Sequence, residues 1–529
     1  MALRPIVVLT ISGSLLLALL SGISRAQSAD SADQSTSWAP AAISHAQRMK
    51  IFPDVRRSTQ TVPRVIPKLK SYSDPTGRIS TFQSARETVT ADNPFFQNLG
   101  TNDRTCFTCH QPETGWTISA ASAQARFARS EGTDPLFRLF DGATCPSDDV
   151  STQSARSTAY KLLTGKGLVR IGLAIPANSE FEVSAVSDPY GCSTNPVTGL
   201  TSPTSGILSM YRRPLPATNL GFDTAIMWDG REPSLAHQAL DATLTHAQAN
   251  GPGLTAEQQA EIVNFETGLF TAQSFDNQAR SLRARSTRLT LTDPVAGTSP
   301  LDCRQTSVPQ TGGPQSLYRL FPDFFAGIND PFGLDPCPTP FTEDVFDIYS
   351  SWARLSGNGQ VSAFRRSVAR GEALFDSKPI SITGVSGLND ALGKPTISGV
   401  CGTCHDTPNV GNHSVATPLN IGIADAAPAG GLDASELPVF TLKCTSPASP
   451  LFGQSFNVTD PGRALITGKC ADIGKFKGPI LRGLAARAPY FHNGSAATLS
   501  DVVEFYDQRF GIGFSDQEKR DLAAFLATL

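Results

Sequence analysis

The feature that most constrains this chain is a short pattern that occurs twice, once in each half. Residues 106–110 read CFTCH and residues 401–405 read CGTCH. Two thiols at this spacing can each add to a haem vinyl group, and a histidine directly after the second thiol can reach the haem iron. The pattern therefore predicts two covalently bound haem c groups. The predicted attachment and ligand residues are Cys106, Cys109, His110, Cys401, Cys404 and His405.

Two other chemistries use a Cys-x-x-Cys pair, and both fit this chain less well. A structural zinc site needs a second pair of ligands, but the remaining cysteines occur singly. A thioredoxin-type redox pair occurs once in a strand-helix unit, without a following histidine in each of two copies. Covalent haem is the interpretation that accounts for both copies.

The first residues predict export. The chain opens with MALRPIVVLTISGSLLLALLSGISRAQS, where one arginine precedes an apolar run and Ser24 and Ala26 supply small residues before a cut after Ala26. This layout is typical of a secretory signal peptide, here 1–26, so we expect a periplasmic or secreted protein with no membrane segment after cleavage. An uncleaved anchor is the alternative, since an apolar run of about 17 residues lies at the short end of the spanning range.

Six of the ten cysteines lie outside the two haem motifs. An even number of single cysteines in an exported, loop-rich chain is typical of disulfides. Six cysteines allow about 15 connectivities, and the shortest loops come from pairing neighbours. The pairs predicted on this basis are Cys145 with Cys192, Cys303 with Cys337 and Cys444 with Cys470.

Length and charge limit the architecture and the partners. A chain of 529 residues is too long for one compact core. The sequence SGNGQ near 360 indicates a boundary, so we expect a polar lead-in over 27–60, a first haem domain with large loops over 61–360 and a second over 361–529. A net charge of −3 without a long basic run makes nucleic acid an unlikely partner.

Local patterns predict a few elements among frequent turns. The apolar piece LVRIGLAIP over 168–176 predicts a short strand. Apolar spacing predicts helices over 362–375, 498–510 and 515–529. The last two open with capping boxes, Thr498 with Asp501 and Ser515 with Glu518.

Scarce methionines and histidines limit the sixth ligands of the two irons. The methionines are Met1, Met49, Met210 and Met227, so the C-terminal half contains none and the second haem lacks a methionine from its own domain. No histidine lies between His110 and His237, so we expect the first haem to keep an open, reactive position.

Three motifs together resemble the di-haem cytochrome c peroxidase and MauG superfamily. They are the two haem motifs in this order, IMWDGREPSLAHQA over 226–239, and KGPILRGLAARAPYFHNGSAATLSDVVEFY over 477–506. The resemblance implies a mainly α fold of two cytochrome c-like helical domains with long loop insertions and a few short strands. It also implies that electrons enter at the C-terminal haem, that hydrogen peroxide is reduced at the N-terminal haem, and that Trp228 lies between them. A core tryptophan at a domain boundary is the alternative for Trp228.

The same resemblance suggests ligands for the second iron. The position where the peroxidases carry a methionine is Tyr506 here, as in the MauG branch, where a tyrosinate stabilises highly oxidised iron. This agrees with the methionine count. His492 is the second candidate, His413 is a weaker one, and a purely structural Tyr506 on an apolar helix face is the alternative.

Peroxide cleavage needs a group that moves a proton between the two oxygens. Where the family places a glutamate, this chain has Gln248, which cannot exchange protons. His246 can do so, unless it is only a capped surface histidine, and Gln238 matches a glutamine of MauG. The family's calcium is not expected as a firm cofactor, because Arg213 replaces its asparagine although Pro489 is present.

These features together predict an exported haem peroxidase-type oxidoreductase. Its expected partners are hydrogen peroxide or oxygen and a small redox protein such as a cytochrome c or a cupredoxin. Long loops over 120–220 and 250–350 leave open a di-haem oxygenase acting on an organic or polymeric substrate. A non-enzymatic periplasmic electron carrier is the third alternative.

Overall fold

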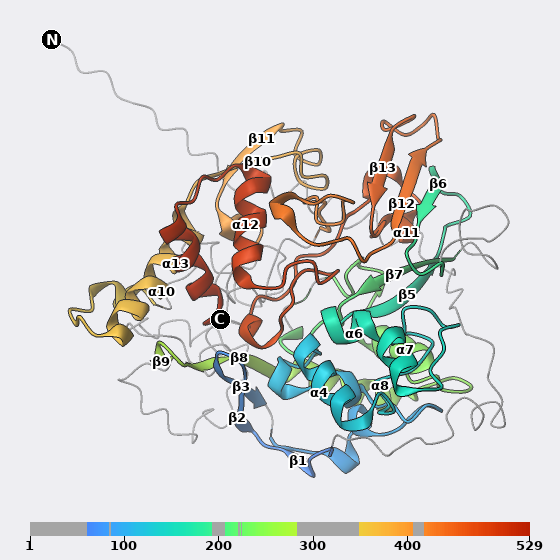
Figure 1. Cartoon of the computed structure of the whole chain (residues 1–529), viewed down its shortest axis with the longest axis horizontal. Coiled ribbons are helices and arrows are strands. Elements are labelled where there is room, and N and C mark those ends of the chain that lie inside the picture. Colours follow the sequence, from blue (N-terminus) through green and yellow to red (C-terminus); the bar gives the residue numbers. More distant parts are fainter. Residues whose placement is uncertain are drawn as a thin grey trace.

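The structure of the protein is a computed structural model, and it describes residues 61–83, 86–192, 207–220, 223, 225–282, 349–405 and 417–529. The predicted signal peptide, the lead-in, Cys303, Cys337 and His413 lie outside these ranges. Figure 1 shows the N-terminal half in blue and green below and to the right, and the C-terminal half in yellow to red above it.

A four-stranded antiparallel sheet runs beneath the N-terminal helices, in the order β2-β3-β8-β9. Its strands are β2 Leu69–Ser73, β3 Gly77–Gln83, β8 Leu269–Asp276 and β9 Arg280–Ser281. β8 is buried over nearly its whole length, because helices cover one face and the C-terminal carboxyl end of the chain lies against it. Gln273 N–H donates to the carbonyl of Leu529 at 3.0 Å, so the last residue of the chain is tied to this sheet.

The helices of the N-terminal half are short, and four have side-chain N-caps. They are α3 Cys106–Cys109, α4 Ala120–Ser130, α5 Gln153–Ala159, α6 Lys161–Lys166, α7 Leu235–Thr245 and α8 Ala256–Thr267. Ser119, Thr152, Ser234 and Thr255 each accept a hydrogen bond from an amide of the first turn, which stabilises the helix start by about 1 kcal/mol.

Smaller sheets connect distant parts of the chain. The strands are β1 Val65–Ile66 with β4 Thr88–Val89, β5 Val169–Ala174 with β7 Ile207–Arg212, β10 Ile380–Thr383 with β11 Thr396–Gly399, and β6 Phe181–Ser187 with β12 Val439–Cys444 and β13 Ser455–Val458. The strand predicted over 168–176 is confirmed by β5. In the last sheet β6 of the N-terminal half pairs with β12 of the C-terminal half.

The prediction of a mainly α fold is wrong. Helices hold 33% and strands with bridges 20% of the described residues. Residues 181–187, within a region expected as a long loop, form a strand, and so do 439–444 and 455–458, for which no element was predicted. Alternate residues of β12, Phe440, Leu442 and Cys444, are buried in an apolar cluster, and this burial favours strands where no helical pattern exists.

The helices of the C-terminal half are α10 Gln360–Ser377, α11 Ala464–Thr467, α12 Leu499–Phe510 and α13 Asp516–Leu526. Three of them, α10, α12 and α13, match the predictions, and the short α11 was not predicted. Both predicted capping boxes are present at the starts of α12 and α13. α10 packs on α13 through Val368, Phe375, Leu522 and Phe525. Short 3-10 turns are η1 Thr90–Asp92, η2 Pro94–Phe96, η3 Pro112–Thr114, η7 Ser350–Arg354, η8 Cys401–Thr403, η9 Ala429–Gly431, η10 Cys470–Asp472 and η11 Leu484–Ala486.

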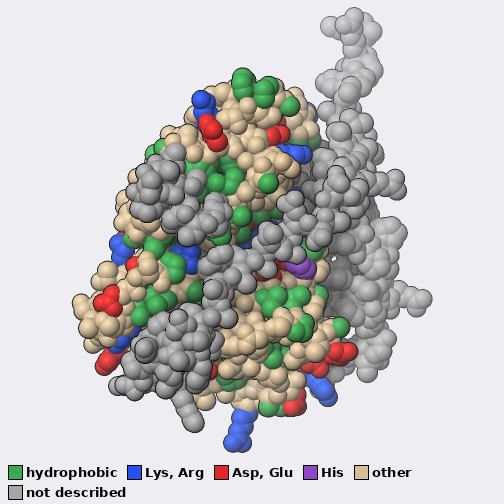
Figure 2. All heavy atoms as spheres, turned by 90° about the vertical axis from the view of Figure 1, so that its right-hand side faces the viewer, with side chains coloured by type: hydrophobic (Ala, Val, Ile, Leu, Met, Phe, Trp, Pro, Cys, Tyr) green, Lys and Arg blue, Asp and Glu red, His purple; other side chains and the backbone are tan. Residues whose placement is uncertain are grey.

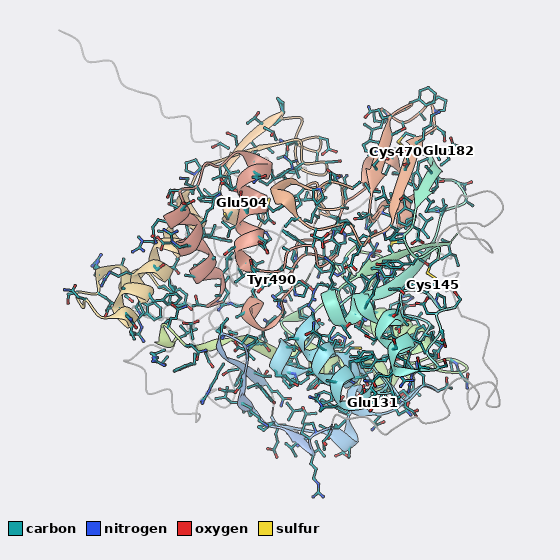
Figure 3. The ribbon with its side chains drawn as sticks, viewed as in Figure 1. Glu131, Cys145, Glu182, Cys470, Tyr490 and Glu504 are labelled. Carbon is teal, nitrogen blue, oxygen red and sulfur yellow. A yellow bond between two sulfur atoms is a disulfide. The ribbon has the colours of Figure 1, made fainter. Side chains whose placement is uncertain are left out.

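Two of the predicted disulfides are confirmed. Cys145 is bonded to Cys192, and Cys444 to Cys470, with Cα atoms 5.6 and 6.0 Å apart. Figure 3 labels Cys145 and Cys470 on the same side of the molecule, where the β6-β12-β13 sheet lies above the N-terminal helices. The third predicted pair falls outside the described residues.

A buried ion cluster joins the two halves. Arg212 at the end of β7 pairs with Asp229 and, at 2.6 Å, with Asp460 of the C-terminal half. Burial opposes ionisation of Asp229, but Arg231 and Arg212 together hold its pKa well below the usual value. The carboxylate of Asp460 also accepts the amide of Gly462 at 2.8 Å. Removal of the guanidinium leaves two buried carboxylates without their common partner.

The surface carries no dominant charge on the face shown in Figure 2, where acidic and basic side chains are scattered among apolar ones. Within the described ranges, none of the helices combines the length and the hydropathy needed to cross a bilayer. Lys161 and Glu436 form one of the exposed ion pairs between the halves, at 3.6 Å.

We expect Arg212→Met to lower the free energy of unfolding by about 3 to 5 kcal/mol, because it leaves the buried carboxylate of Asp460 without its guanidinium partner and that of Asp229 with Arg231 alone. Urea unfolding followed by circular dichroism measures the change. Lys161→Met is the matched control, since it removes an exposed pair between the same halves and should cost less than about 1 kcal/mol. Equal losses in the two variants would contradict the role given to the Arg212 cluster.

Candidate haem-binding sites

The first cysteine motif forms the one-turn helix α3, capped by Thr105. Phe107 and Thr108 point into the protein and are buried, while Cys106, Cys109 and His110 keep accessible surface. The motif thus leaves its two thiols and its imidazole partly exposed, with Cys106 and Cys109 at the edges of two apolar clusters. This is the arrangement that covalent attachment of a haem requires.

His110 is oriented by a backbone carbonyl. Its Nδ1 lies 2.8 Å from the carbonyl oxygen of Trp116, and because that oxygen only accepts, Nδ1–H donates. The lone pair is then on Nε2, which is the usual arrangement for a histidine that binds a metal. Burial lowers the pKa of His110. The hydrogen bond to Trp116 raises it, and a positive charge on His246 lowers it. His110 therefore fits the role of a neutral iron ligand.

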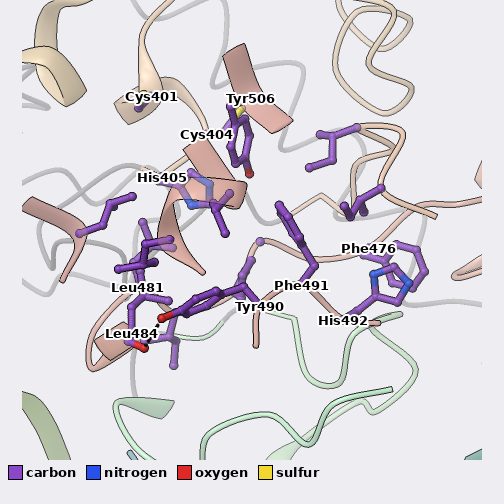
Figure 4. Close-up of a pocket in the computed structure, with 18 of the residues that line it drawn as sticks. Cys401, Cys404, His405, Phe476, Leu481, Leu484, Tyr490, Phe491, His492 and Tyr506 are labelled. Carbon is purple, nitrogen blue, oxygen red and sulfur yellow. Dashed lines mark hydrogen bonds between the residues drawn. The ribbon is translucent and has the colours of Figure 1, made fainter. Parts of the chain in front are cut away.

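The second motif occupies η8 and the residues after it, at the wall of a large apolar cavity (Figure 4). Cys401, Cys404 and His405 line this cavity. Most of its other walls come from strands, loops and helices of the C-terminal half, and one side comes from the N-terminal half, including Arg213 and Trp228. Within the described part of the chain, the four cysteines of the two motifs form no disulfide. An apolar cavity with two such thiols and an imidazole at its edge fits a haem.

Tyr506 and His492 both line this cavity but lie in different parts of it. Figure 4 shows Tyr506 beside Cys404 and His405, and His492 apart from them, next to Phe476. The pKa of Tyr506 is raised by burial and by the charges of Cys404 and Cys401, which places it within electrostatic range of the motif. The structure therefore brings Tyr506, rather than His492, close to the second motif.

His492 is buried and stacked on Phe476, with ring centroids 3.9 Å apart. Burial lowers its pKa to about 4. Its Nε2 has no hydrogen-bond partner among the described residues, and its pKa is influenced by Asp460 and Arg212 instead of by the cysteines. His492 is therefore a neutral imidazole on the side of the cavity that faces the ion cluster.

Trp228 connects the two halves through the main chain. Its Nε1–H donates to the carbonyl of Arg213 at 2.7 Å, and its own carbonyl accepts the amide of Lys477 at 2.8 Å. The amide of Arg213 in turn donates to the carbonyl of His492 at 2.6 Å. Trp228 also lines the cavity of the second motif, so it extends from the N-terminal half to that site.

Arg213 occupies a cage of carbonyl oxygens. Its guanidinium donates to the carbonyls of Ile118, Lys166 and Arg487 at 2.6 to 2.9 Å. Burial, together with the nearby charge of Arg487, lowers the pKa of Arg213 to about 9. The guanidinium of Arg213 therefore bridges carbonyls of both halves at this point.

The candidates for peroxide cleavage are not equivalent. His246 lies just after α7, and its Nδ1 is 2.8 Å from Oδ2 of Asp141. A positive charge on His246 lowers the pKa of His110. Gln238 is half-buried on α7, and the backbone carbonyl of Gln248 accepts the hydroxyl of Thr101 at 2.7 Å. Among the described residues, no hydrogen bond joins either glutamine side chain to the first motif, whereas the carbonyl of His246 is bonded to Asn102, four residues before Cys106.

Two acidic residues near the first motif, Asp141 and Glu266, could not be identified from the sequence. Asp141 pairs with Arg104 and His246, and Glu266 on α8 is buried within electrostatic range of Cys106. Burial raises the pKa of Glu266 to about 8, and its Oε2 has no partner among the described residues. No local pattern marks either residue, because their environments are made by segments distant in the sequence.

We expect Cys401→Ala with Cys404→Ala to halve the covalently bound haem of the purified protein, measured as the pyridine haemochrome per chain. Cys106→Ala with Cys109→Ala is the matched variant and should remove the same amount. Loss of all haem in either double variant would contradict two independent attachment sites.

The pKa of Glu266 predicts a specific pH effect on stability. A glutamate of the unfolded chain titrates near 4.5, whereas the folded protein holds the proton up to about 8, so wild-type stability falls as pH rises between these values. We expect Glu266→Gln to gain about 2 to 4 kcal/mol relative to wild type between pH 5 and pH 8 in urea unfolding. Glu257→Gln, exposed on the same helix, should show no such gain. If the difference in unfolding free energy between Glu266→Gln and wild type does not change with pH, Glu266 does not hold a proton in the folded protein.

Comparison with curated proteins gives similarity over a short stretch, and no family model matches the chain. Cytochrome-c peroxidase IdrP2 of Denitromonas iodatirespirans is 45% identical over 78 residues, and cytochrome-c peroxidase IdrP1 of Pseudomonas sp. (strain SCT) is 41% identical over 81 residues. The cytochrome c551 peroxidase of Nitrosomonas europaea is 42% identical over 69 residues. Each match covers 13% of this chain and 21% of the relative, so the chain spans about a fifth of the length of these relatives.

Among solved structures, a MauG-like protein associated with microbial copper homeostasis aligns with 83% of this chain and 86% of its own length. The identity is 16% and the TM-score is 0.34, which does not establish a common fold. The curated relatives are all named cytochrome c peroxidases. Over this short stretch, the resemblance to cytochrome c peroxidases that the motifs predict is therefore confirmed.

Proposed function

We propose that the chain is an exported di-haem oxidoreductase that reduces hydrogen peroxide at the site of His110 and receives electrons through the site of His405. One observation carries this proposal: the two motifs have different surroundings. The first has a histidine-carboxylate pair within electrostatic range, and the second has a buried tyrosine and an apolar cavity. A proton-transfer group at the first site suits peroxide reduction, and an apolar enclosure at the second suits electron transfer.

Haem bound at the first site would supply the redox chemistry of peroxide reduction, with His110 as its protein ligand. His246 then transfers a proton: its Nε2 accepts the proton from one peroxide oxygen and returns it to the other oxygen, which leaves as water. Each peroxide takes up two electrons and two further protons and gives two water molecules. The electrons come from a small redox protein such as a cytochrome c or a cupredoxin.

At the second site the chain's own residues hold and enclose the group. Cys401 and Cys404 would form the covalent links, His405 would be one ligand and Tyr506 the other. The cavity walls are mainly apolar and keep water away from the bound group. An oxygen ligand favours the oxidised state of iron, which suits a site that holds oxidising equivalents.

Trp228 is proposed to carry electrons between the halves. It lines the second cavity, and its side chain and main chain are hydrogen-bonded to both halves. Its ring lies 6.1 Å from that of His492, centroid to centroid. Export is supported by the disulfides Cys145–Cys192 and Cys444–Cys470, because such bonds persist in oxidising compartments.

We expect the purified protein to oxidise a reduced cytochrome c or cupredoxin when hydrogen peroxide is added, and His246→Leu to lower kcat/KM for peroxide by about 100-fold. Stopped-flow absorbance of the donor measures both. His237→Leu is the control, because His237 is on the same helix but pairs with Glu232, and it should leave the rate unchanged.

Other outcomes identify the alternatives. Oxygen uptake with an organic or polymeric substrate, without added peroxide, would favour the oxygenase. Reversible electron transfer without any reaction with peroxide, cyanide or oxygen would favour the electron carrier. Electron paramagnetic resonance of the oxidised protein before and after Tyr506→Phe tests the ligand, since an unchanged low-spin signal would exclude Tyr506.

A further inference from the structure

We propose that Asp141 is a positioning residue that holds His246 with Nδ1 protonated and presents Nε2 as the proton acceptor of the N-terminal site. This inference rests on the proposed function of that site. It adds a second residue, from a different segment of the chain, to the proton-transfer group. It also defines which nitrogen of His246 acts.

The hydrogen bond between the two side chains defines the tautomer. Oδ2 of Asp141 lies 2.8 Å from Nδ1 of His246, and the two residues are 105 positions apart in the sequence. An ionised carboxylate only accepts hydrogen bonds, so Nδ1 must carry the proton. The lone pair of the neutral imidazole is then on Nε2, for which the structure gives no hydrogen-bond partner among the described residues. The side chain of His246 is 36% exposed, so Nε2 is accessible to a small molecule.

Arg104 keeps the carboxylate ionised. Its Nη1 lies 2.6 Å from the same Oδ2 of Asp141, and both side chains are buried. Burial opposes ionisation of Asp141, but Arg104 and the bond from His246 outweigh it, and the pKa of Asp141 is lowered. Arg104 is itself held by the carbonyls of Pro135 and Leu136 at 2.8 and 2.7 Å. The acceptor for His246 is thus a fixed negative charge on a rigid support.

The backbone of His246 is held in place as well. Its carbonyl accepts a hydrogen bond from Nδ2 of Asn102 at 2.8 Å. The amide of Arg104 donates to Oδ1 of Asn102 at 3.2 Å. Asn102 and Arg104 lie just before the first haem motif, so the histidine is tied at both its ring and its main chain to the segment that enters that motif.

The pair faces the first motif. Arg104, which pairs with Asp141, and Asn102, which binds the carbonyl of His246, both belong to the segment that leads directly into Cys106. The molecule contains a second pair of the same kind, His237 with Glu232, whose histidine is 49% exposed at the start of α7. Among the described residues, the second pair has no hydrogen bond to Asn102 or Arg104. Position, and not the pairing alone, singles out Asp141 and His246.

Asp141→Asn tests the tautomer directly. An amide can donate its own N–H to Nδ1, which moves the ring proton to Nε2 and removes the acceptor. The readout is the rate of cyanide binding to the oxidised protein, followed by the Soret band, because hydrogen cyanide must lose its proton to a nearby base before it binds. We expect Asp141→Asn and His246→Gln each to slow binding by about 10- to 100-fold, and the double variant to be no slower than either single variant.

Asp134→Asn is the matched control. Asp134 is also buried, is paired with Arg126 and acts on Cys109, whereas the carboxylate bonded to Nδ1 of His246 is that of Asp141. It should leave the cyanide rate within about twofold of wild type, and Asp141→Glu, which keeps the charge, should recover part of the rate lost in Asp141→Asn.

Each failure has a distinct meaning. A wild-type protein that binds neither cyanide nor peroxide would overturn the proposed function, and the inference with it. Wild-type binding rates in both Asp141→Asn and His246→Gln would overturn the inference alone. If Asp141→Asn does not fold, His246→Gln still decides, because it leaves the Arg104–Asp141 pair intact; additive losses in the double variant would show two independent effects and would also overturn the inference.

Discussion

The guanidinium of Arg212 is the contact on which the arrangement of the two halves depends. It binds Asp229 of its own half and Asp460 of the other, and all three side chains are buried. Two of the three stand next to a residue of the site: Arg213 follows Arg212, and Trp228 precedes Asp229. Because the ion cluster holds both backbones, the hydrogen bond from Trp228 to the carbonyl of Arg213 forms at the wall of the cavity. A buried electrostatic contact thus determines where the tryptophan lies.

The surroundings of the two motifs differ because different kinds of structure build them. The first lies among aromatic side chains of short helices, with Phe95, Phe107 and Trp116 buried around it, and ion pairs at one edge. The second lies at the end of a cavity whose walls include the apolar faces of α12 and α13. The two motifs have the same cysteines and histidine at the same spacing. The first nevertheless lies beside polar groups that can exchange protons, and the second lies in an apolar cavity.

Local features could be predicted from the sequence, and long-range ones could not. The helix over 362–375, the strand over 168–176 and both capping boxes depend on neighbouring residues, and they match α10, β5, α12 and α13. The pairing of β6 with β12 joins segments about 250 residues apart and has no local signature, so the fold class was predicted with too little strand. The same limit applies to the site: His246 was identified by its chemistry, but its contact with Asp141 depends on tertiary structure.

The cage around Arg213 has a consequence for how the halves stay together. The carbonyls of Ile118, Lys166 and Arg487 come from three separate segments, and a side chain of the protein bridges them. A bound metal ion in such a place would exchange with the medium and could be withdrawn by a chelator. A guanidinium is covalently part of the polypeptide, so the junction beside Trp228 is independent of the supply of divalent ions in the compartment where the protein works.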